Sequence, residues 1–145
     1  MRSQPIRILL SAAACSAVLL GASVAHAELF PDESLLKKDR ENVAGGQGTV
    51  SGKYAFFRDK AKKDDAVKEI SWLTIPPGAS IGYHKHINNE DAYIIVSGTG
   101  MFRDADGKEY PVKKGDVLMT RKGESHGLAN TGTEPLVFVD VIAEQ

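Results

Sequence analysis

The chain has 145 residues, a formal net charge of -1 and one cysteine. This length suits one ordinary globular domain and leaves no room for a second sizeable one. The 18 basic and 19 acidic residues are mixed along the chain without a basic stripe, which argues against nucleic acid and anionic membranes as partners.

The N-terminal 27 residues have the pattern of an export signal. Arg2 and Arg7 provide a positive start, residues 8–24 are mostly apolar, and the triplet that ends at Ala27 has the small-x-small form of a cleavage site. The apolar run is shorter than the roughly 20 residues that cross a bilayer. We therefore expect cleavage after Ala27 and a mature chain that is periplasmic or secreted, with no membrane attachment.

Cys15 is the only cysteine. It lies inside the apolar run with further apolar residues after it, so a lipid-attached chain is the less favoured alternative. The mature chain from Glu28 would contain no cysteine, and therefore neither a disulfide nor a thiolate metal ligand.

Residues 28–48 are predicted to form a polar arm, because this segment is charged and ends in a glycine-rich break. From residue 49 onward, short β-prone segments recur between turn sequences, without a sustained helical period. The predicted strands are 53–57, 67–75, 80–86, 92–96, 100–103, 109–112, 116–120, 127–130 and 136–142. Many short strands with tight turns predict an all-β domain over residues 49–145, either a sandwich or an antiparallel barrel.

Three histidines remain after the expected cleavage: His84, His86 and His126. Side chains alternate between the faces of a strand, so His84 and His86 point the same way, about 7 Å apart along the chain. Two imidazoles at this spacing can bind one divalent metal ion. A turn at Asn88-Asn89, where asparagine tolerates left-handed backbone, would return the chain and bring a carboxylate of Glu90 or Asp91 to the histidines.

These residues lie in two ordered motifs that resemble those of the cupin superfamily. The first motif is Gly78, five residues, His84-Lys85-His86, four residues, Asp91, six residues and Gly98. The second is Gly115, five residues, Arg121, one residue, Gly123, two residues, His126, three residues and Asn130, with Arg121 where the family usually has proline. The resemblance implies a single-domain antiparallel β-barrel, a double-stranded β-helix or jelly roll, in residues 49–145.

The resemblance also implies that His84, His86, His126 and one carboxylate hold a divalent transition metal ion. The family's acidic ligand is normally glutamate, but the spacing to Gly98 places Asp91 at that position, with Glu90 one residue earlier. Both faces of this strand are apolar, so alternation does not decide between the two carboxylates. We expect Asp91 to be the ligand, with Glu90 as the alternative. Imidazole and carboxylate ligands suit Fe, Mn, Zn, Cu, Ni or Co.

Three histidines and a carboxylate leave open positions on a six-coordinate ion. Cupins with such a set resemble oxidases, dioxygenases, isomerases and lyases, so the first hypothesis is an exported metal-dependent enzyme that acts on a small oxygenated molecule. The alternative is a non-catalytic periplasmic module that binds a small ligand or a metal. A storage-type barrel is disfavoured because such members generally lack the full ligand set.

The surroundings of the site follow from barrel geometry. Five large side chains lie on strands that should surround it, where plain core packing is favoured over a role in the pocket wall and no catalytic role is expected: Trp72, Tyr83, Tyr93, Phe102 and Met119. Arg121, and less so Arg103, could bind a substrate carboxylate or phosphate. Small single-barrel cupins commonly form homodimers, so we also expect a homodimer, in which the arm could add a strand across the interface.

Overall fold

The computed structural model describes residues 27–144, so the segment 1–26, which holds most of the predicted export signal, lies outside the described residues. Within 27–144 no helix is long and apolar enough to cross a membrane. The elements, in chain order, are η1 (Asp32–Ser34), β1 (Leu36–Glu41), η2 (Val43–Gly45), β2 (Thr49–Phe56), η3 (Arg58–Lys60), β3 (Val67–Ile75), β4 (Ser80–Lys85), β5 (Glu90–Ser97), β6 (Thr99–Arg103), β7 (Glu109–Lys113), β8 (Val117–Thr120), β9 (Ser125–Ala129) and β10 (Leu136–Ala143).

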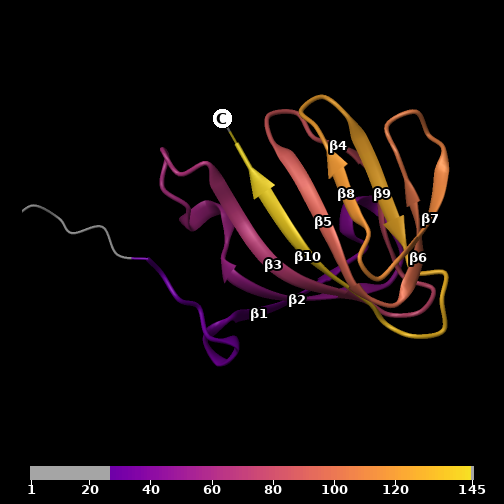
Figure 1. Cartoon of the computed structure of the whole chain (residues 1–145), viewed down its shortest axis with the longest axis horizontal. Coiled ribbons are helices and arrows are strands. Elements are labelled where there is room, and N and C mark those ends of the chain that lie inside the picture. The colour runs from indigo at the N-terminus through magenta and orange to yellow at the C-terminus, as the bar shows by residue number, and fades with distance from the viewer. Residues whose placement is uncertain (1–26, 145) are drawn as a thin grey trace, which may run out of the picture.

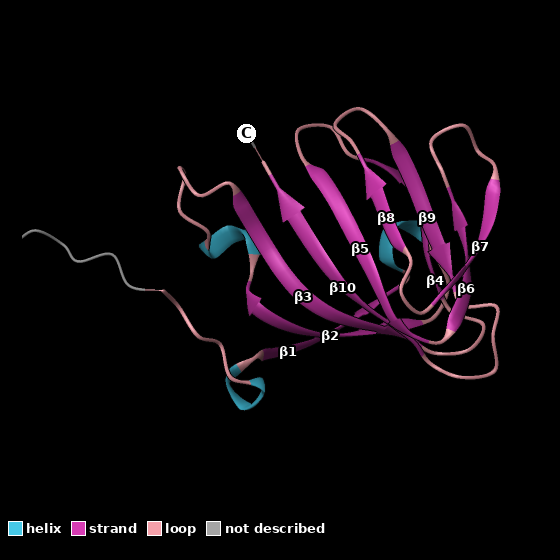
Figure 2. Ribbon diagram, viewed as in Figure 1, coloured by secondary structure: helices cyan, strands magenta, loops and turns pink. Residues whose placement is uncertain are grey.

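The strands form two antiparallel sheets, with the order β1-β2-β3-β10-β5-β8 in the larger and β4-β9-β6-β7 in the smaller. Figure 1 shows the larger sheet curving past the smaller one, and Figure 2 shows that the described helices are short single-turn segments. The all-β class is therefore confirmed. The described strands form the two sheets of a jelly roll, as predicted, and these sheets do not join into one continuous closed sheet.

The core lies between the two sheets and follows directly from the alternation of side chains along the strands. In β10, every second residue from Leu136 to Ile142 is buried. Phe138 is fully buried and packs its ring against Tyr93, with ring centroids 4.5 Å apart. The same inward faces also carry buried polar residues, with Asp140 on β10 and Glu69 and Ser71 on β3.

The outward-facing side of the larger sheet is also apolar. Trp72, Ile94, Val117 and Met119 are 42–64% exposed and lie on the strands β3, β5 and β8. Trp72 and Met119 therefore point away from the interior, and the expectation that they surround the site is wrong. The predicted homodimer stays a prediction.

The arm supplies an extra strand, as the sequence analysis allowed, but this strand pairs within the chain and not across a dimer interface. β1 pairs with β2 of the same chain, and Arg40 lies opposite Val50. The following turn, η2, packs closely against β4, where a Cβ on Gly82 would lie only 2.2 Å from the carbonyl oxygen of Ala44. Glycine at position 82 therefore lets the arm approach the strand that carries the histidines.

Candidate metal centre

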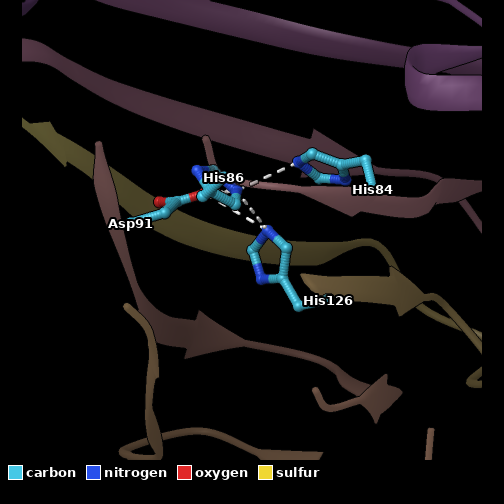
Figure 3. Close-up of side chains that lie close together, drawn as sticks. All are labelled: His84, His86, Asp91 and His126. Carbon is cyan, nitrogen blue, oxygen red and sulfur yellow. Dashed lines mark hydrogen bonds and ion pairs between the residues drawn. The ribbon is translucent and has the colours of Figure 1, made fainter. Parts of the chain in front are cut away.

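Three strands bring the histidines and one carboxylate together. His84 lies on β4 directly opposite His126 on β9, His86 follows the end of β4, and Asp91 lies near the start of β5. One ligand atom from each of the four residues lies within 4.8 Å of the others. Figure 3 shows their side chains converging from separate strands on one point.

The inward orientation of His84 depends on an irregularity in β4. The pairing of β4 with β9 shifts register between Ile81 and His84. An ideal strand would place residues 81 and 84 on opposite faces, yet Ile81 is a buried core residue and the His84 ring faces His86 and His126. The irregularity therefore lets one strand supply both a core residue and the histidines.

The structure separates the two candidate carboxylates clearly. Asp91 is 3% exposed, and its Oδ2 lies 3.4 Å from Nε2 of both His86 and His126. Glu90 points to the opposite side of β5, where Arg121 donates a 2.8 Å hydrogen bond to its Oε2. Asp91 is thus the carboxylate that the fold brings to the histidines, and neither Glu90 nor Arg121 is part of this cluster.

The hydrogen bonds behind the histidines fix which ring nitrogen carries the proton. Nδ1 of His84 lies 2.9 Å from the carbonyl oxygen of Gly82, and Nδ1 of His86 lies 2.6 Å from Oδ1 of Asn89. Both oxygens can only accept, so both Nδ1 atoms donate, and each neutral ring keeps a lone pair on Nε2. These two Nε2 atoms nevertheless face each other at 3.2 Å. Two converging lone pairs without a proton between them are what a bound cation requires.

Four of the six distances among the ligand atoms fit one ion, and the other two, both from His84, lie within 4.8 Å. Ligand atoms about 2.1 Å from a metal are about 3.0 Å apart at a right angle and about 3.4 Å apart at the tetrahedral angle. Nε2 of His86 lies 3.0 Å from that of His126 and 3.2 Å from that of His84, and the distances to Asp91 Oδ2 are 3.4 Å. The four residues can therefore hold a metal ion.

Asn89 orients the ring of His86, although the sequence analysis assigned it only to a turn. No positive φ is recorded for Asn88 or Asn89, so the left-handed conformation expected there is wrong. Asn89 is 5% exposed, and its amide oxygen holds the ring of His86 instead. The turn of the second motif holds the same residue, because the Gly123 amide donates to the carbonyl oxygen of His86 at 2.6 Å.

Burial and the neighbouring ionisable groups together set the pKa values of the cluster. Burial, together with the neighbouring imidazoles, lowers the pKa of His84 despite its hydrogen bond to Gly82. Burial alone would raise the pKa of Asp91, but His126 and Asp140 lower it below its ordinary value. Burial and then the charge of Asp91 raise the pKa of Asp140 well above its ordinary value. A neutral imidazole beside an ionised carboxylate is the form that binds metals.

Several buried polar atoms at the centre lack partners within the described part of the chain. They are Asp91 Oδ1, Asp140 Oδ1 and His126 Nδ1. Tyr93 and Phe102 pack on the ring of His126, with centroids 4.9 and 5.9 Å away, as expected for wall residues. Tyr83, in contrast, is 42% exposed and its hydroxyl donates to Ala105 outside the cluster.

Two of the three histidines, His84 and His86, open into a cavity of about 310 Å³. Besides His84, His86 and Asp91, its lining includes Arg40 from β1 and Arg58 from η3. Arg103, which stacks over Tyr83, does not line this cavity, and neither does Arg121. The two arginines at the cavity therefore come from segments that the sequence analysis did not connect with the site.

Comparisons with known proteins agree with this architecture. Residues 71–142 match the Cupin_2 family, described as a cupin domain. The oxalate-binding protein of Thermotoga maritima is 36% identical over 122 residues, which cover 84% of this chain and 93% of that protein.

Two solved structures were compared as well. The crystal structure of a predicted oxalate decarboxylase from Thermotoga maritima superimposes with a TM-score of 0.73 at 32% identity, covering 81% of this chain and 100% of that one. A cupin 2 conserved barrel domain protein from Rhodopseudomonas palustris has a TM-score of 0.59 at 20% identity, covering 75% of this chain and 71% of that one, and shares the fold. The chain belongs to the cupin family.

Proposed function

We propose that the protein binds oxalate through a divalent transition metal ion held by His84, His86, Asp91 and His126. The observation that carries the proposal is the convergence of three Nε2 atoms and one carboxylate oxygen beside a cavity that His84, His86 and Asp91 line. The bound ion would act as a Lewis acid for carboxylate oxygens at its remaining positions. The 36% identity to an oxalate-binding protein supports oxalate as the ligand.

The surroundings of the cluster favour a small anion. Arg40, Arg58 and Lys85 line the cavity together with the carboxylates of Glu69, Asp91 and Asp140. A divalent ion would make this lining net positive, which attracts anions. A volume of about 310 Å³ is at the small end of ligand sites, and it accommodates a dicarboxylic acid of a few carbons.

A second candidate is the enzymatic one, cleavage of oxalate. The similarity to a predicted oxalate decarboxylase favours it. The reaction would convert hydrogen oxalate to carbon dioxide and formate, with the proton ending on the carbon of formate. Binding is common to both candidates, so turnover is what separates the enzyme from the binding module.

Isothermal titration calorimetry tests the proposal. The mature chain from Glu28, loaded with one metal at a time, should bind oxalate at one site per chain, and the chelator-treated chain should bind none. Carbon-13 NMR of labelled oxalate in the same samples would report formate. Equal oxalate binding with and without metal, or none in either form, would refute the proposal.

We also propose that the protein is exported, with cleavage after Ala27, and acts as a homodimer outside the cytoplasm. Export rests on the positive start, the apolar run and the cleavage-type triplet of the first 27 residues. Dimer formation is supported by the exposed apolar side chains Trp72, Ile94, Val117 and Met119 on the outer face of the larger sheet.

A further inference from the structure

Arg40 reaches the metal cavity from a segment outside the two cupin motifs. It lies on β1, in the arm that precedes the domain, and shares the lining of the cavity with His84, His86 and Asp91. β1 is an edge strand, paired only with β2 among the described strands. The arm therefore completes one wall of the pocket.

The side chain of Arg40 is held in place by two buried partners. Its Nε donates a 2.9 Å hydrogen bond to the Tyr54 hydroxyl, which Nη2 also contacts, and Nη2 lies 3.5 Å from Oε1 of Glu69. Tyr54 and Glu69 are 1% and 6% exposed, whereas the Arg40 side chain keeps 38% of its surface exposed. The guanidinium is thus fixed from one side and open on the other.

The open side still has hydrogen-bond donors. A guanidinium carries five N–H donors, two of them on Nη1. The contacts of Arg40 within residues 27–144 involve Nε and Nη2, which leaves both Nη1 donors available. Arg58, the other arginine at the cavity, is exposed on η3 and has no such support. An anchored, planar donor pair is suited to carboxylate oxygens and requires little ordering when a ligand binds.

We propose that Arg40 is a specificity-determining residue of the pocket: it selects dianionic dicarboxylic acids by receiving, on Nη1, the carboxylate oxygens that the metal does not bind. This inference rests on the proposed function, because it assumes that the ligand is bound at the metal centre. A metal-chelated oxalate has two such outer oxygens, and a longer dicarboxylate has a complete second carboxylate.

Oxalate and oxamate test this inference. Oxamate replaces one carboxylate with an amide, so it keeps chelating oxygens and nearly the same size but carries one negative charge fewer. Calorimetry on the metal-loaded mature chain should be run with both ligands for wild type, Arg40→Gln and Arg40→Lys. Arg103→Gln is the matched control, because Arg103 lies outside the cavity.

We expect Arg40→Gln to weaken oxalate binding about 10- to 100-fold, the usual loss for a charged hydrogen bond, and to weaken oxamate binding much less. Arg40→Lys should restore part of the preference for oxalate, and Arg103→Gln should match wild type. Metal content and thermal midpoint, measured on each variant, report any structural effect of losing the Tyr54 and Glu69 contacts.

Equal losses for both ligands in Arg40→Gln would overturn the inference, because a merely structural role would affect them alike. An unchanged oxalate preference in Arg40→Gln, or in Arg40→Lys if the glutamine variant does not fold, would also overturn it. Failure of metal-loaded wild type to bind oxalate would instead refute the proposed function and the inference with it. The two failures are therefore distinguishable.

Discussion

Replacing Asn89 with alanine should weaken metal binding without unfolding the domain. Oδ1 of Asn89 accepts a 2.6 Å hydrogen bond from Nδ1 of His86, and both residues are buried. Without this acceptor, the imidazole of His86 would have a buried N–H that lacks a partner. Such a loss costs about 1–3 kcal/mol.

The histidine can avoid this cost only by changing tautomer. If the proton moves to Nε2 of His86, that atom can donate to Nε2 of His84, which lies 3.2 Å away. This tautomer satisfies the metal-free protein, but it removes the lone pair that would bind the ion. The cost therefore falls on metal binding, and at about 1.4 kcal/mol per tenfold the dissociation constant should rise roughly 5- to 150-fold.

Competition with a chromophoric chelator measures this change. Asn89→Asp retains an acceptor oxygen and should bind metal at least as tightly as wild type, whereas Asn88→Ala, at an exposed neighbour, should match wild type. Chemical denaturation of the metal-free variants should give nearly unchanged stability. A dissociation constant for Asn89→Ala within twofold of the Asn88→Ala control would refute the reasoning.

Three further predictions follow from the core, the outer face and the N-terminus. Phe138→Ala should lower the free energy of unfolding by about 3–5 kcal/mol in urea titrations at a fixed metal concentration. Val139→Ala, on the other face of β10, should lower it by well under half as much. Similar losses in the two variants would contradict the assigned core. The wild-type chain should elute as a dimer in light-scattering chromatography and Ile94→Lys as a monomer, whereas a wild-type monomer would exclude the homodimer. N-terminal sequencing of protein from the cell envelope should begin at Glu28, and an intact Met1 would exclude cleavage.

The strands with alternating or continuous apolar residues were predictable from the sequence. Nine of the predicted segments overlap the strands β2 to β10, because inward-facing apolar residues recur with a period of two and end at turn residues. The bounds and the partner of β1 were missed because its sequence, Leu36–Glu41, is almost entirely charged. Its stability comes from pairing with β2, a long-range interaction that no local pattern reveals.

The sequence revealed only those site residues whose side chains are common metal ligands. The three histidines and the spacing of Asp91 were visible in the sequence, and the structure brings these four residues together. The choice between Asp91 and Glu90 could be made only from the structure, which shows in which direction each side chain points. Asn89 and Arg40 were not identified, because an amide in a turn and an arginine on a charged edge have ordinary roles until the fold places them beside the histidines.

Elemental analysis of the purified mature chain tests the central claim most directly. Wild type and Glu90→Ala should each contain one divalent transition metal ion per chain, and Asp91→Ala should have lost most of it, because Asp91 faces the histidines while Glu90 pairs with Arg121. Circular dichroism would verify that both variants are folded. Metal content that is absent in folded wild type after reconstitution, or that depends on Glu90 and not on Asp91, would contradict the account.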